Sequence, residues 1–196
     1  MFLRRKAAGI SWLAVFLGNP GARFENTRHN AGFMTADAIA KSSGVKIDRL
    51  KFNSLTAIAD IGGERVLLMK PQTYMNLSGS AVRQAMHFYK VPLDKVLAVS
   101  DDVSMPPGKL RIRRSGSAGG HNGLKDIIEK CGGEMFPRIK IGVGASPDKN
   151  RDLRDWVLSQ LSGEDKKLME GAASGAAAAL EAIVSRGIEA AMGEFN

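Results

Sequence analysis

The chain has a single cysteine, Cys131, among its 196 residues. A disulfide framework is therefore excluded, and a reducing compartment is favoured. The sequence also lacks a long apolar run, because the stretch from Ala7 to Leu17 is shorter than the ~20 residues that a membrane-spanning helix needs. This stretch follows three basic residues, 4–6, as in a short signal peptide, but it leads directly into a polar turn of functional character, and we therefore expect no cleaved leader. Internal repeats and a Gly-x-Ser-x-Gly nucleophile elbow are also missing.

The composition is that of an ordinary globular protein, with 44% hydrophobic and 24% charged residues. At this length a single domain is expected. The formal net charge of +8 favours a polyanionic partner, with nucleic acid first and a membrane surface second. The membrane reading is weak, since the C-terminal helix carries several acidic residues, Glu164, Asp165, Glu170, Glu181 and Glu189.

Apolar periodicity predicts strands that alternate with helices along the chain, which indicates an α/β fold. The predicted strands are 12–17, 55–61, 65–70, 96–99, 109–113 and 139–143. The predicted helices are 30–41, 78–90 with Ser78 as its cap, one from 124, 157–161 and a long C-terminal helix over 163–195. Gly62-Gly63 indicates a hairpin, so we expect one domain with a twisted mixed β-sheet flanked by helices, preceded by a basic extension over residues 1–9.

Three polar clusters stand out, and two of them follow apolar strands. Asn19 and His29 form the first cluster, and residues 74–76 (Tyr-Met-Asn) form the second. The third joins Asp101, at a strand end, to the pair His121-Asn122. Because ligands of open α/β sheets bind beyond the carboxyl ends of the strands, we expect the clusters to meet in one cleft.

Such a cleft suits hydrolysis by an activated water. Histidine is the natural base at neutral pH, and a carboxylate such as Asp101 would fix its tautomer. Asparagines would pair with substrate amides and a developing oxyanion. Simpler readings stay open at this point: His29 as a helix cap, Asp101 as part of a turn, or His29, His121 and Asp101 as metal ligands, although their spacing matches no common metal motif.

Basic residues alternate with apolar ones along two predicted strands. Lys109, Arg111 and Arg113 flank Leu110 and Ile112, and Arg138 and Lys140 flank Ile139. With a side-chain period of two, each strand would bury one face and present cations on the other. This exposed face is either an ordinary solvated surface or a phosphate-binding surface beside the cleft.

Taken together, these segments resemble the bacterial peptidyl-tRNA hydrolase family. Five motifs carry the resemblance in the family's order and spacing: GNPGARFENTRHNAGF (18–33), KPQTYMNLSGSAV (70–82), SDDVSMPPGKLRIR (100–113), GGHNGLKDI (119–127) and RIKIGVG (138–144). Each motif alone is weak, but five in order are highly specific. The resemblance covers roughly residues 12–160.

The resemblance implies a monomeric, cytoplasmic esterase, without cofactor or metal, that cleaves the bond between a peptide and the 3′ end of tRNA. It implies that His29 is the catalytic base and Asp101 its partner. The implied peptide and water contacts are Asn19, Phe24, Met75, Asn76 and Asn122. The implied tRNA contacts are Arg113 and Lys140, beside which we expect Arg111 and Arg138.

The departures from the family pattern are modest. Phe24 stands where the family often has tyrosine, and Ser100 and Asp102 stand where it often has histidine and glutamate. An alternative is a non-catalytic RNA-binding relative of the same fold. The intact set of His29, Asp101 and three asparagines argues against that alternative.

Overall fold

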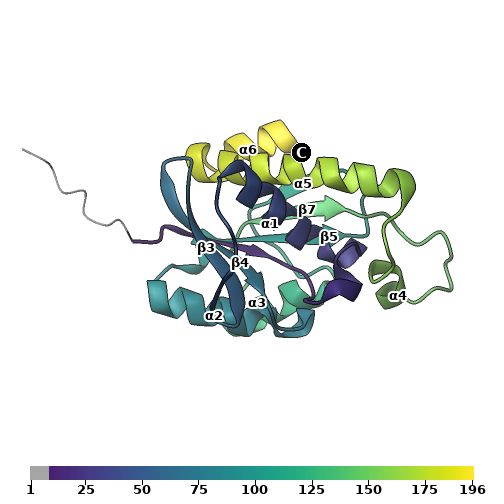
Figure 1. Cartoon of the computed structure of the whole chain (residues 1–196), viewed down its shortest axis with the longest axis horizontal. Coiled ribbons are helices and arrows are strands. Elements are labelled where there is room, and N and C mark those ends of the chain that lie inside the picture. The colour runs from purple at the N-terminus through teal and green to yellow at the C-terminus, as the bar shows by residue number, and fades with distance from the viewer. Residues whose placement is uncertain (1–8) are drawn as a thin grey trace, which may run out of the picture.

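The computed structural model describes residues 9–196, and eight of the nine residues of the expected basic extension lie outside this range. One seven-stranded sheet runs through the molecule in the order β2-β3-β4-β1-β5-β7-β6 (Figure 1). Its strands are β1 (Trp12–Phe16), β2 (Arg49–Lys51), β3 (Ser54–Ile61), β4 (Glu64–Pro71), β5 (Val96–Asp102), β6 (Leu110–Arg113) and β7 (Arg138–Gly142). The central pairs β4-β1, β1-β5 and β5-β7 are parallel, whereas β2-β3, β3-β4 and β6-β7 are antiparallel. The predicted mixed sheet and its hairpin are therefore confirmed.

Helices cover both faces of the sheet, because the central strands are apolar on both sides. Trp12, Ala14 and Phe16 of β1 face one core, and Leu13 and Val15 face the other. The first core is covered by α1 (Ala31–Ser42), α5 (Gly163–Arg186) and α6 (Ile188–Phe195). The second is covered by α2 (Ser78–Tyr89) and α3 (Asn122–Cys131), so the two layers lie on opposite sides of the sheet (Figure 1).

Three local predictions were wrong. Ser78 is the first residue of α2 rather than its cap, and its hydroxyl donates to the carbonyl of Met75. The short helix lies earlier than predicted, as α4 (Leu153–Val157), and the Asp152 carboxylate caps it by accepting from the amide of Arg154. The long C-terminal helix is two helices, because the backbone at Gly187 turns to a φ of 90° that ends α5.

The loops at the carboxyl ends of the central strands are brought together by close packing of α1 on the sheet. Gly32, at the start of α1, lies so near Leu17 and Val99 that a Cβ there would overlap their backbone atoms. The short turn Arg28–Asn30, which precedes α1 and carries His29, therefore lies directly beside the end of β5. No helix within residues 9–196 is both long and apolar enough to cross a membrane.

At the sheet edge, Ile112 of β6 is paired with the side chain of Asn196. The amide of Ile112 donates to Oδ1 of Asn196 at 2.6 Å, and Nδ2 of Asn196 donates back to the carbonyl of Ile112 at 3.3 Å. The carboxamide of Asn196 thus makes the pair of bonds that a neighbouring strand would make.

Candidate active site

A cavity of about 710 Å³ opens beyond the carboxyl ends of β1 and β5. The predicted residues that line it are Asn19, Phe24, His29, Met75, Asn76, Asp101, Asn122 and Lys140. They come from loops, short 3₁₀ helices, strand ends and the start of α3, which are far apart in the sequence. The expected convergence of the three polar clusters on one cleft is therefore confirmed.

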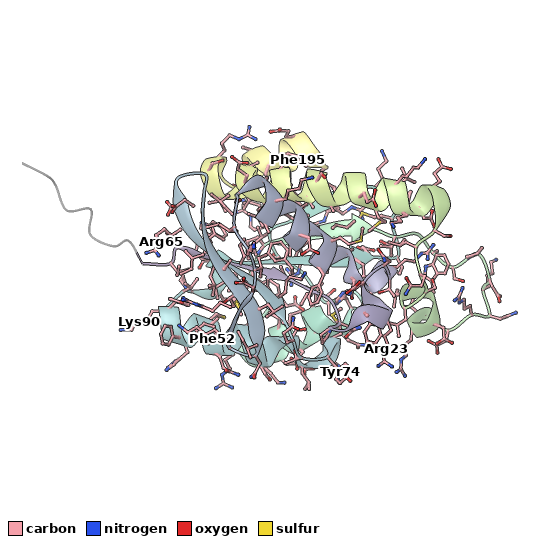
Figure 2. The ribbon with its side chains drawn as sticks, in the orientation of Figure 1. Arg23, Phe52, Arg65, Tyr74, Lys90 and Phe195 are labelled. Atoms are coloured by element: carbon pink, nitrogen blue, oxygen red, sulfur yellow. The ribbon has the colours of Figure 1, made fainter. Side chains whose placement is uncertain are left out.

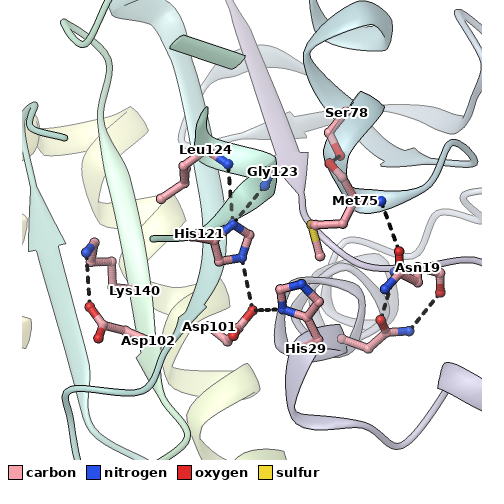
Figure 3. Close-up of polar contacts among 11 residues, drawn as sticks. Asn19, His29, Met75, Ser78, Asp101, Asp102, His121, Gly123, Leu124 and Lys140 are labelled. Atoms are coloured by element: carbon pink, nitrogen blue, oxygen red, sulfur yellow. Dashed lines mark hydrogen bonds and ion pairs between the residues drawn. The ribbon is translucent and has the colours of Figure 1, made fainter. Parts of the chain in front are cut away.

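Two histidines that line this cavity donate to one carboxylate oxygen (Figure 3). Nδ1 of His29 lies 2.8 Å from Oδ1 of Asp101, and Nε2 of His121 lies 3.0 Å from the same oxygen. The Asp101 side chain is only 4% exposed, so this carboxylate is held away from water. The two imidazole rings lie on either side of it, with centroids 5.0 Å apart.

The hydrogen bonds determine the tautomers of both rings. Nδ1 of His121 accepts from the amides of Gly123 and Leu124 at the start of α3, so the proton of this ring is on Nε2. An ionised Asp101 accepts only, so Nδ1 of His29 carries the other proton. Nε2 of His29 then keeps its lone pair, and within residues 9–196 no hydrogen bond occupies it. The arrangement presents one free basic nitrogen to the cavity.

The charges of this pair stabilise each other. Burial disfavours the imidazolium of His29, but the negative charge of Asp101 and its hydrogen bond outweigh this effect and raise the pKa of His29 above its ordinary value. Burial likewise disfavours the carboxylate, yet His29 and His121 together hold the pKa of Asp101 well below its ordinary value. Asp101 therefore stays ionised, and the raised pKa makes His29 a stronger base than an ordinary histidine.

The same three side chains were also considered as metal ligands, and their ligand atoms all lie within 4.8 Å of one another. Coordination requires a lone pair on the ligating nitrogen. The nitrogen of His121 that faces the cluster is Nε2, which carries the proton because Nδ1 accepts two backbone amides. This pattern favours a hydrogen-bonded base over a metal centre.

Of the three predicted asparagines, Asn19 holds a neighbouring turn in place through a hydrogen bond, whereas the side chains of Asn76 and Asn122 form no hydrogen bond among the described residues. Oδ1 of Asn19 accepts from the amide of Met75 at 2.9 Å, which ties the 3₁₀ turn Met75–Leu77 to the end of β1 and leaves the NH₂ group of Asn19 to meet a ligand. Asn30 fixes the backbone of Asn19 through two further bonds. Asn76 and Asn122 are exposed on the cavity wall, and neither side chain has a hydrogen-bond partner among the described residues.

Comparison with known proteins shows which family this chain belongs to. The sequence model of the peptidyl-tRNA hydrolase family matches residues 13–196. The chain belongs to the peptidyl-tRNA hydrolase family. A peptidyl-tRNA hydrolase of Caldanaerobacter subterraneus is 50% identical over 185 residues, which cover 94% of this chain and 99% of that relative. The one of Carboxydothermus hydrogenoformans is 48% identical, over 92% of this chain and 95% of its own length.

The fold agrees with this assignment. The crystal structure of peptidyl-tRNA hydrolase from Acinetobacter baumannii superposes with a TM-score of 0.88 at 35% identity, covering 95% of this chain and 94% of that one. The predicted fold class and family are therefore confirmed.

The predicted cationic surface of this family member is only partly present. Arg113 is exposed and Arg111 is half-buried on β6, and Lys140 lines the cavity with its Nζ 3.0 Å from Oδ2 of Asp102. The prediction of an exposed cation at Arg138 was wrong, because its side chain is 1% exposed. Its guanidinium is covered by the ring of Phe136 and by the backbone carbonyls of Glu134 and Gly116.

Sequence reasoning gave too small a role to His121, which holds Asp101 from the side opposite His29. It also missed Arg23 (labelled in Figure 2) and Arg154, which line the cavity on the 3₁₀ turn Ala22–Phe24 and on α4. The signal for His121 was its place directly before a helix, where a side chain that accepts backbone amides is expected. Arg154 carried no such signal, since α4 reaches the cavity only through tertiary contacts.

Proposed function

We propose that this protein hydrolyses the ester between a peptide and the 3′ end of tRNA, returning free tRNA to translation. The observation that carries the proposal is the free Nε2 of His29 inside the cavity, on a ring whose other nitrogen is bound to a buried, ionised Asp101. A base held in this way suits attack by water on an activated carbonyl.

The proposed reaction has two proton transfers through His29. Nε2 takes a proton from water as the oxygen attacks the ester carbonyl carbon, and Asp101 stabilises the imidazolium that forms. The tetrahedral intermediate then collapses, the bond to the ribose 3′ oxygen breaks, and the imidazolium returns the proton to that leaving oxygen. The products are a peptide carboxylic acid and a tRNA hydroxyl. No cofactor enters this balance.

We assign substrate contacts to the side chains that line the cavity. The NH₂ group of Asn19 and the free carboxamides of Asn76 and Asn122 would hydrogen-bond the peptide backbone and hold the water. Met75 and Phe24 supply apolar contacts. A free α-ammonium offers donors and a charge in place of an amide, so this lining would disfavour aminoacyl-tRNA.

The tRNA phosphates would meet Arg111, Arg113 and Lys140 beside the cavity. Phosphate contacts of this kind position a nucleic acid without reading its sequence. Arg138 does not belong to this set, because its guanidinium is buried. We further propose that the enzyme acts as a monomer in the cytoplasm.

The test is release of labelled peptide from purified peptidyl-tRNA by the wild-type protein, with and without a chelator. Cleavage that survives the chelator supports the metal-free mechanism, and loss of cleavage that added zinc restores would replace it with a metal mechanism. Binding of peptidyl-tRNA without any cleavage would identify the non-catalytic RNA-binding relative instead.

A further inference from the structure

Among residues 9–196, Arg138 is the largest side chain that is fully buried, at 1% exposure, and it is the first residue of β7, the strand next to the sheet edge. Its guanidinium stacks on the ring of Phe136, with Cζ 4.0 Å from the ring centroid. No carboxylate in the described part of the chain forms an ion pair with it, although the charge of Glu134 partly opposes the lowering of the pKa of Arg138 by burial. A buried cation without a close counter-ion is costly unless other polar groups surround it.

Backbone carbonyls from two separate segments take the place of a counter-ion. Nη1 of Arg138 donates to the carbonyls of Glu134 at 3.2 Å and Phe136 at 3.0 Å, just before β7. Nη2 donates to the carbonyl of Gly116, 22 positions earlier in the chain. The guanidinium thus joins the segment before β7 to the loop that follows β6.

That loop forms one wall of the candidate active site. Ala118, Gly119 and Gly120 line the cavity, and the next residue is His121, which donates to Asp101. Gly116, Gly119 and Gly120 have φ values of 137°, 56° and 82°, which residues with a Cβ rarely adopt. A glycine-rich loop has little conformational preference of its own, so external bonds must fix its course.

Few other bonds could do so. The loop's remaining backbone bonds are from the amide of Gly116 to Glu134, at 3.4 Å, and from the amide of His121 to Ala118. The first of these bonds ends on the carbonyl of Glu134, which also accepts from Arg138. Both links between the loop and the segment before β7 therefore meet at the guanidinium of Arg138.

We propose that Arg138 is a positioning residue for hydrolysis: by holding the Gly116 carbonyl it fixes the 116–120 wall and the place of His121 beside Asp101. It does not touch substrate. This inference rests on the proposed function, and it replaces the role in tRNA binding that the sequence pattern predicts for Arg138.

The first test compares Arg138→Lys and Arg138→Ala with Arg83→Gln, a control that removes an exposed charge from α2. An ammonium cannot span three carbonyls as a planar guanidinium can. We expect both Arg138 variants to lose about 10- to 100-fold in kcat, the scale of a small misplacement of catalytic groups. KM and its salt dependence should change little, and the control should behave as wild type.

The second test is chemical rescue and local exchange. Guanidinium chloride at millimolar concentrations should restore part of the kcat of Arg138→Ala, whereas ammonium chloride at equal ionic strength should not. Amide hydrogen exchange at residues 116–121 should accelerate in Arg138→Lys, with the exchange of the central strands unchanged.

Two results would overturn the inference. One is unchanged kcat and unchanged loop exchange in Arg138→Lys. The other is a raised KM with a weaker salt dependence, which would make Arg138 a phosphate contact. If Arg138→Ala does not fold, Arg138→Lys decides through kcat and exchange. If the wild type cleaves nothing, the proposed function fails, and the exchange experiment still decides whether Arg138 holds the loop.

Discussion

Nδ1 of His29 and Oδ1 of Asp101 lie 2.8 Å apart, although 72 positions separate the two residues in the chain. The bond joins a 3₁₀ turn after β1 to the end of β5, the neighbouring parallel strand. Because Asp101 is held at the end of β5, its carboxylate keeps the proton of His29 on Nδ1. Nε2 of His29 therefore keeps its lone pair.

Replacing the base is the most direct check of the proposed chemistry. His29→Ala should lower kcat for peptidyl-tRNA by about 10²- to 10⁴-fold, the usual contribution of a general base. Thermal unfolding of the variant should stay cooperative, because the ring is not part of either apolar core. Turnover at the wild-type rate would remove His29 from the mechanism.

Activity should fall as pH decreases, and the fall should begin above the pH at which an ordinary histidine is protonated. The reason is that the charge of Asp101 raises the pKa of His29, and the protonated ring cannot accept a proton from water. A raised histidine pKa contributes stability that is fully present below the unfolded pKa and is lost as pH rises through the folded pKa. Activity should therefore already be falling at a pH above ~6.5, the ordinary pKa of histidine, while the enzyme remains folded, as circular dichroism at each pH would show.

Asp101→Asn should shift the acidic side of the pH–rate profile to lower pH. The amide keeps the shape of the carboxylate but lacks the charge that favours the imidazolium, so the pKa of His29 should fall. We expect a smaller loss of kcat than in His29→Ala. An unchanged profile at every pH would show that Asp101 is not the electrostatic partner.

Two substitutions can separate the two roles of His121, which caps α3 and donates to Asp101. His121→Asn can still accept the amides of Gly123 and Leu124, so the melting temperature should change little while kcat falls. His121→Ala loses the cap as well and should also lose about 1 kcal/mol of stability. Equal kcat in wild type and His121→Asn would leave only the capping role.

The phosphate-binding proposal predicts opposite effects from the two partners of one ion pair. Lys140→Ala should raise KM more than it lowers kcat, and it should weaken the dependence of KM on salt. Asp102→Asn should lower KM, because the carboxylate 3.0 Å from Nζ of Lys140 would no longer compete with phosphate. Arg113→Ala should resemble Lys140→Ala. A fall in kcat alone would place these residues in the chemistry instead.

The sequence predicted the sheet, the hairpin and the meeting of His29 with Asp101, because strand periodicity and strand ends are local signals. It did not predict the features that depend on contacts between segments far apart in the chain. Residues 158–161 look helical in isolation, but Gln160 forms a bridge with Thr27 and Leu161 donates to Asn26. An Arg–Ile alternation also cannot reveal that the loop after β6 and the segment before β7 enclose Arg138, and so its burial was missed.

The carboxamide of Asn196 has a consequence for how copies of this protein behave toward one another. By occupying both polar groups of Ile112 it blunts an outer strand that could otherwise recruit the same strand from a second molecule. Removing Asn196 alone would leave the amide and carbonyl of Ile112 unpaired, and we expect its effect to be self-association at high concentration rather than a defect in hydrolysis.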